Sequence, residues 1–352
     1  MHLPRPTTLA FLALATSSLA VAQGGERHAI SGNTVAIYNL AGHVDIVAGA
    51  GSDVAVEVNR GGADARKLRI EKGTRDGAND LRVVYPNDDI VYPALGRWSN
   101  STVSYSRDGY FNGDRENRWN RIRVRGSGGG TEAWADLRVE VPVGKSVTVN
   151  LVVGEVVATN VKGRLRIDVG AARVRARGHE GQLSIDAGSG RVVAEEVTGD
   201  LEIDNGSGGV ELTNVTGDRV KIETGSGGVR GTRVKAADLD VDVGSGGVHI
   251  DRVTAERAKF DAGSGSLAVE FLNSPRSLNV DTGSGGVSLA FPASLSADIE
   301  VESGSGRITN DFALTVDRLD RHSLRGKIGG GEGRIQVDTG SGGVRITKKT
   351  TE

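Results

Sequence analysis

The sequence predicts an all-β fold: a single-stranded parallel β-solenoid (β-helix) of about ten coils with an N-terminal β cap. The first observation is a recurring Gly-Ser-Gly tripeptide, and the second is a set of apolar columns that keep one phase relative to it. The third is composition, since 52 of the 352 residues are Gly, about twice the usual share. Only 7 residues are Pro and no Gly-X-Y period runs through the chain, which excludes collagen.

The tripeptide recurs at nearly constant spacing. Six successive intervals measure 18 to 21 residues, and the seventh, of 36 residues, is expected to contain a degenerate copy around residues 329–333. A copy of this length is too short to form a core of its own, so the copies are expected to stack. The copies begin at Gly188, Gly206, Gly225, Gly244, Gly263, Gly283, Gly304 and Gly340.

Each copy alternates apolar and polar residues with a period of two. The positions five and three before the tripeptide and four after it are apolar in all eight copies, as at Leu201, Ile203 and Val210. The position between the first two is polar throughout. Period-two alternation predicts short strands with one buried face, and stacked copies would bury like side chains on one another.

An antiparallel β-sandwich with a hairpin at each Gly-Ser-Gly-Gly segment is the alternative fold. Hairpin pairing would not require the apolar positions to keep the same offsets from the tripeptide in all eight copies, so these constant offsets favour the solenoid. In either fold Gly suits the corner, because it accepts backbone conformations and close approaches that other residues resist.

The rest of the chain divides around the repeats. Residues 23–84 alternate cleanly and are predicted to form the first coils or an N-terminal β cap, residues 85–134 an insertion, and residues 135–352 the repeat solenoid. At the far end, Lys348, Lys349 and Glu352 would close the chain with charge and discourage end-to-end stacking.

Residues 1–22 are predicted to be a secretory signal peptide. A short apolar segment, Leu9–Ala15, is followed by the small-x-small pattern Ala20–Ala22, so the mature chain is expected to begin at Gln23. No later segment has the roughly 20 apolar residues of a membrane span. The absence of Cys excludes a lipid-anchored lipoprotein and disulfides. The predicted location is therefore the periplasm or the cell exterior.

Charge and motifs argue against several functions. With 43 Lys and Arg against 45 Asp and Glu, the chain lacks the basic excess of a nucleic-acid-binding protein. Two segments spell Asp-Thr-Gly-Ser as aspartic proteases do, but the same four positions read DAGS, DNGS, ETGS and DVGS in other copies, so the motif belongs to the repeat. No catalytic residue, metal ligand or cofactor is predicted.

An acidic column is the most regular polar feature. The residue two positions before each tripeptide is acidic and should point outward, so that like charges stack. We expect these carboxylates to accept hydrogen bonds from the corner N–H groups; the alternative is a stripe that collects divalent cations such as Ca²⁺. The column consists of Asp186, Asp204, Glu223, Asp242, Asp261, Asp281, Glu302 and Asp338.

The insertion contains the candidate binding residues. It holds all three Trp and four of the five Tyr, together with several Arg, a composition typical of interface anchors. The alternative is that these rings cover the open end of the solenoid; in that case they would be buried. The candidates are Trp98, Tyr105, Tyr110, Trp119, Arg97, Arg107 and Arg118.

The segment VAIYNLAGHVDIVAGAGSDVAVEV and the units LEIDNGSGGVEL, VKIETGSGGVRG and LNVDTGSGGVSL resemble the bacterial putative-adhesin family of Gly-rich β-strand-repeat proteins, a domain of unknown function. The resemblance spans roughly residues 30–350, interrupted by the insertion. It implies an extracytoplasmic β-solenoid-like protein without established enzyme activity, and it carries over no site residue.

The combined expectation is a non-enzymatic structural or interaction protein of the cell envelope that displays a surface to a glycan or protein. A polysaccharide-active enzyme on a β-helix scaffold is one alternative, which would need paired carboxylates in a groove along one face. A Ca²⁺-stabilised repeat protein is the other.

Overall fold

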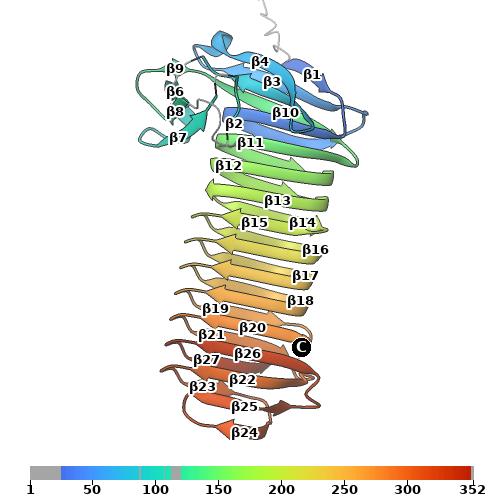
Figure 1. Cartoon of the computed structure of the whole chain (residues 1–352), viewed down its shortest axis with the longest axis vertical. Helices are drawn as coiled ribbons and strands as arrows, with labels where there is room; N and C mark the ends of the chain where they lie inside the picture. The colour runs from blue at the N-terminus through green and yellow to red at the C-terminus, as the bar shows by residue number, and fades with distance from the viewer. Residues whose placement is uncertain (1–24, 87–88, 107, 112–119, 350–352) are drawn as a thin grey trace, which may run out of the picture.

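The computed structural model describes residues 25–86, 89–106, 108–111 and 120–349; the predicted signal peptide and Glu352 lie outside these ranges. The described chain is a β-solenoid whose parallel coils stack into a rod (Figure 1). The coils at its centre are formed by β12 (Lys162–Arg177), β13 (Glu180–Ser189), β14 (Val192–Thr198), β15 (Leu201–Asn205), β16 (Val210–Thr224), β17 (Val229–Val243), β18 (Val248–Ala262), β19 (Leu267–Phe271), β20 (Ser277–Thr282) and β21 (Val287–Pro292).

Consecutive copies pair in parallel with like positions side by side. Ile203 of β15 pairs with Ile222 of β16, and Val210 of β16 pairs with Val229 of β17. Antiparallel hairpins at each tripeptide are therefore wrong, and the predicted solenoid is confirmed. The three predicted apolar columns are buried in all eight copies, except that Ile308 is only partly buried. Ile308 lies in the outermost parallel coil, which has no further parallel coil to cover it.

The Gly-Ser-Gly corner is where adjacent coils approach most closely. A Cβ atom on Gly208 would lie 1.5 Å from the carbonyl oxygen of Gly190 in the neighbouring coil, which only Gly allows. The corner is held from inside by the residue just before the tripeptide. The buried Asn205 amide donates to the carbonyl oxygens of Gly190 (3.1 Å) and Gly208 (2.9 Å), and the Thr224 hydroxyl donates to Gly227 at 2.7 Å.

A second bend recurs in the coils between residues 145 and 262. Its central residue adopts the left-handed conformation, with φ between 55° and 60° in the non-Gly cases. That conformation turns the chain without interrupting the parallel pairing on either side. The bend residues are Asn160, Gly178, Glu196, Asn214, Arg233 and Arg252.

The N-terminal end is closed by antiparallel strands. Strand β2 (Thr34–Gly49) pairs in parallel with β11 (Lys145–Thr159) along one edge, and with β5 (Ala78–Val84) and β10 (Trp134–Pro142) along the other. Beyond them, β3 (Val54–Gly61) pairs antiparallel with both β10 and β1 (Glu26–Ile30), and β4 (Arg69–Arg75) pairs antiparallel with β5. Residues 23–84 thus contribute, where described, both to a coil and to the cap.

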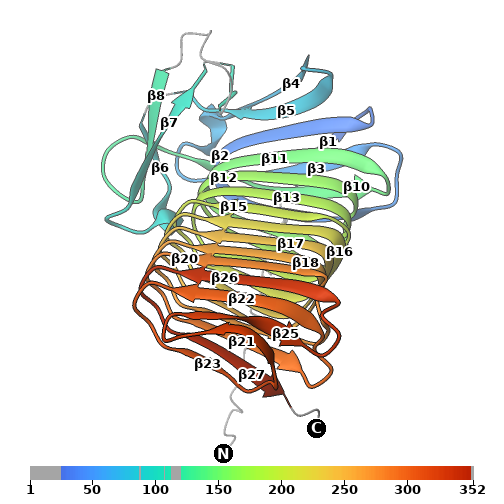
Figure 2. The same ribbon diagram turned by 60° about the horizontal axis from the view of Figure 1, so that its bottom comes forward.

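The insertion forms a separate small sheet beside this end of the rod (Figures 1 and 2). Its strand order is β7-β8-β6-β9. The 3₁₀ turn η2 (Pro93–Leu95) lies between β6 and β7, and a second, η1 (Ala65–Lys67), lies between β3 and β4. The four strands are β6 (Asp89–Val91), β7 (Asn100–Tyr105), β8 (Asn120–Arg125) and β9 (Thr131–Glu132).

The C-terminal end departs from the predicted order of coils. The last copy, β26 (Gly333–Thr339) and β27 (Val344–Lys349), lies between the coil of β20 and β21 and that of β22 (Ala297–Ser303) and β23 (Ile308–Asn310). The 36-residue interval holds no degenerate copy, because its strands β24 (Thr315–Leu319) and β25 (Ser323–Ile328) run antiparallel and cap β22. The prediction that Lys348 and Lys349 close the rod is therefore wrong, because the antiparallel strands β24 and β25 form this end.

Candidate binding surfaces

Most described aromatic rings of the insertion lie inside the protein. Tyr85, Tyr92, Tyr105 and Tyr110 are each less than 9% exposed. The Tyr85 hydroxyl donates to the Asn39 side-chain oxygen at 2.9 Å, and the Tyr105 hydroxyl accepts the Tyr85 N–H at 3.0 Å. Burial raises the pKa of Tyr105 to about 12. These rings join the insertion to the end of the solenoid, so they contact no solvent-borne ligand in this conformation.

Tyr110 is the centre of a buried polar cluster. Its hydroxyl donates to Asp80 at 2.6 Å, and Asp80 also pairs with the Arg82 guanidinium at 2.9 Å. The guanidinium groups of Arg75 and Arg82 each lie 4.5 Å from the centre of the Tyr110 ring. Burial and the Asp80 carboxylate raise the pKa of Tyr110. The cluster fixes the insertion to β4 and β5.

Trp98 differs from all these rings. It is 87% exposed, and the Arg97 guanidinium lies 5.3 Å from its ring centre. The Arg97 backbone is held in turn, because the Ser127 hydroxyl donates to its carbonyl oxygen at 2.6 Å. An exposed indole beside a guanidinium is the arrangement expected of a recognition residue. Three further candidates, Arg107, Arg118 and Trp119, lie outside the described residues.

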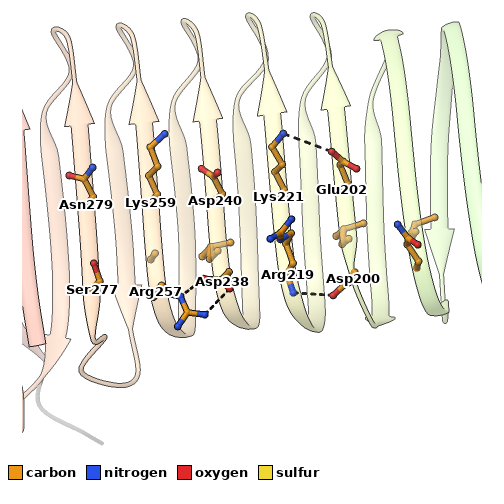
Figure 3. A pocket seen from close by; sticks show the side chains of 15 residues that line it. Asp200, Glu202, Arg219, Lys221, Asp238, Asp240, Arg257, Lys259, Ser277 and Asn279 are labelled. Atoms are coloured by element: carbon orange, nitrogen blue, oxygen red, sulfur yellow. Dashed lines mark hydrogen bonds and ion pairs between the residues drawn. The ribbon is translucent and has the colours of Figure 1, made fainter.

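A shallow groove of about 640 Å³ runs across six neighbouring coils on one face of the rod (Figure 3). Two rows of side chains project from it, and in each row the charge alternates from coil to coil. Like-charged neighbours on adjacent strands would repel, whereas alternation stabilises the stack. One row is Asp200, Arg219, Asp238, Arg257 and Ser277, and the other is Glu202, Lys221, Asp240, Lys259 and Asn279.

Several groove charges are paired with one another. Arg257 lies 2.8 Å from Asp238, and this hydrogen bond lowers the pKa of the Asp238 carboxyl. Lys221 lies 2.8 Å from Glu223 and 3.8 Å from Glu202, which raises the pKa of its ammonium group. The alternation is visible in the sequence four and six positions before the tripeptides at Gly206, Gly225, Gly244 and Gly263, although the prediction of strands uses only the polarity of the first of these positions.

The predicted acidic column forms an unbroken ladder along the rod. Its residues pair in register from coil to coil, and Asp338 stands between Asp281 and Glu302 because of the exchanged coil order. Partial burial, and then the carboxylates above and below, raise the pKa values of Asp204 and Asp242. The ladder is therefore a line of like charges under mutual repulsion.

The prediction that the carboxylates of this column accept hydrogen bonds from the corner N–H groups is wrong. The corner backbone is bonded by the next residue along the chain, which points inward, as Asn205 and Thr339 do. Within the described ranges, no cluster of three or more His, Asp or Glu side chains is arranged to hold a metal ion. In the same ranges, no helix is long and apolar enough to cross a bilayer.

Comparison with known proteins places the repeat region in a family. A structure comparison returns a crystal structure of a "putative cell adhesion protein" from Clostridium sporogenes, 10% identical over 92% of this chain and 98% of that chain, with a TM-score of 0.21. A search of curated proteins gives no match. The sequence profile of Toastrack DUF4097, a domain of unknown function, matches residues 133–347. Since this match covers more than half of the chain, the protein belongs to the Toastrack DUF4097 family.

Proposed function

We propose that this protein is an exported, non-enzymatic interaction protein of the bacterial cell envelope, adhesin-like in that a rigid rod displays a binding surface to a glycan or protein. The observation that carries the proposal is Trp98. Trp is highly buried on average, whereas this one is 87% exposed, as an interface anchor is before its partner binds. The carbonyl oxygen of the preceding residue, Arg97, accepts a hydrogen bond from the Ser127 hydroxyl, so little ordering of this turn would accompany binding.

The chemistry of this surface suits a sugar ring or a protein side chain. An indole face stacks on apolar C–H faces, and Arg97 beside it offers donors to hydroxyl, carbonyl or carboxylate oxygens. The signal peptide predicted over residues 1–22 supports placement outside the cytoplasm, in the periplasm or on the exterior. No membrane span, lipid anchor, cofactor or nucleic-acid partner enters the proposal.

The test is binding of the purified mature chain to a glycan array and to solubilised envelope fractions. Trp98→Ala should lose binding at least about tenfold, in line with hot-spot Trp residues. Val143→Ala is the matched control, because Val143 is also exposed, at 73%, and lies outside the insertion. Equal binding by both variants and the parent chain would refute a role for Trp98.

A polysaccharide-active enzyme is the second candidate, because the charged groove runs along one face as such an enzyme requires. One of its carboxylates, Asp238, is poorly suited to the task. A glycosidase needs a carboxyl whose pKa is raised so that it can donate a proton, whereas ion pairing with Arg257 lowers the pKa of Asp238. Turnover of envelope or plant polysaccharides by the purified chain, abolished by Asp238→Asn and Asp240→Asn together, would favour the enzyme.

A further inference from the structure

We propose that two copies of this protein associate tail to tail through the outer edge of β24, which forms the C-terminal extreme of the rod (Figure 1). Within the described chain β24 pairs with β25 along one edge. All five of its residues are exposed. An exposed strand edge of this kind is a template for pairing with another chain.

The edge carries two exposed apolar side chains. Val316 is 49% and Leu319 is 68% exposed. A bulge between Val316 and Arg318 shifts the register, so Val316 stands opposite Gly326 and Leu319 opposite Leu324. Since those partners are two residues apart on β25, Val316 and Leu319 share one face of the sheet. They form an uncovered apolar pair at the end of the core.

The sequence of the edge is complementary to itself. If two copies of β24 pair antiparallel about a twofold axis between Asp317 and Arg318, each Asp317 faces the Arg318 of the other copy. In the same register each Val316 faces the other copy's Leu319. Two apolar pairs thus form from one four-residue segment, and each Arg318, which lies 3.1 Å from Asp320 of its own chain, also faces an Asp317 across the axis. A twofold contact of this type uses the same patch on both copies and closes at a dimer.

A second copy is therefore the occupant that the edge favours. A strand of unrelated sequence would satisfy the backbone groups equally well, but it would not match both the charge order and the apolar pair. The bulge limits the number of regular backbone hydrogen bonds along this edge. We therefore expect a reversible dimer that dissociates on dilution.

The test uses the full mature chain in sedimentation velocity over a range of concentrations. The parent chain should pass from monomer to dimer, and Asp317→Arg or Arg318→Asp alone should raise the dissociation constant about tenfold or more, because like charges then face each other. The double variant with both changes restores opposite charges across the axis and should dimerise as the parent does. Arg345→Glu, a charge reversal at an exposed position of β27, is the control and should leave the dimer unchanged.

Three outcomes would overturn the proposal. The first is a parent chain that stays monomeric up to its solubility limit. The second is a dimer that both single variants preserve, or that the double variant fails to restore. The third is growth beyond the dimer, because a contact between β24 and a different surface would continue from copy to copy.

Discussion

The third position of the Gly-Ser-Gly corner should tolerate no side chain, whereas the Gly that follows it should. A Cβ atom on Gly208 would lie 1.5 Å from the Gly190 carbonyl oxygen, and real Cβ contacts are essentially never shorter than 3.0 Å. The coils would have to separate by about 1.5 Å at this point. On Gly209 the nearest atom to an added Cβ lies 3.7 Å away, which is an ordinary contact.

The cost of Gly208→Ala follows from what the separation breaks. Asn205 is fully buried and bonds the carbonyl oxygens of both Gly190 and Gly208. Each such bond contributes about 1 kcal/mol, and an unsatisfied buried amide costs about 1–3 kcal/mol. We therefore expect a loss of about 3 kcal/mol in the free energy of unfolding. Gly209→Ala should be neutral or stabilising by up to about 1 kcal/mol, since Ala restricts the unfolded chain.

The assay is urea unfolding of the two single variants and the parent chain, followed by far-ultraviolet circular dichroism. Gly285 and Gly286 repeat the contrast two-thirds of the way along the repeats, with nearest atoms at 1.8 and 3.7 Å. If the third-position variants unfold at the same urea concentration as their neighbours, the corner is not held by close coil contact and the explanation fails.

Three further predictions concern charge, pH and the order of the coils. Asp204→Asn should raise the melting temperature at neutral pH and low salt, by an amount worth less than about 1 kcal/mol because Asp204 is exposed. Since the pKa of Asp204 is raised in the folded protein, this gain in stability should vanish as the pH falls towards 3.8. A gain that changes with neither salt nor pH would contradict mutual repulsion of the carboxylates. Burial lowers the pKa of His179, so stability is complete above pH 6.5 and should fall as the pH drops below it; melts at pH 7 and pH 5 should show a smaller difference for His179→Gln than for the parent chain. Deleting residues 333–352 removes an internal coil, so the chain should aggregate in size-exclusion chromatography, and a folded monomer of normal stability would count against the described coil order.

The stacked core could be predicted from the sequence because a coil buried above and below must carry the same residue classes at the same positions. Leu201, Ile203 and Val210 and their counterparts therefore kept one phase, and the structure buries them. The order of the last coils could not be predicted for the same physical reason. Every copy presents the same apolar columns to its neighbours, so the coil of Ile335 and Val337 fits equally well against either flanking coil. The 36-residue interval was the sequence feature that differed.

The candidate site was less predictable because an aromatic residue suits both a core and a surface. Composition located the rings of residues 85–134 but did not separate Tyr105 and Tyr110, which pack inside, from Trp98, which does not. That separation depends on where the small sheet rests against β4 and β5. The alternating charges of the groove were readable in the columns, as at Arg219 and Asp238, once sign and not only polarity is considered.

The two ends of the rod are the places where this sequence is free to differ from its own repeat. Along the sides, each residue must match the coils above and below, and the charged rows pair among themselves, as Arg257 does with Asp238. At the ends that constraint lapses. There lie Trp98, the most exposed aromatic ring among the described residues, and the exposed apolar side chains of Val316 and Leu319. If the tail-to-tail contact forms, two Trp98 surfaces point away from each other at opposite ends of a doubled rod. A monomer that binds its partner weakly would then bridge two partners, or gain avidity on a surface that displays many.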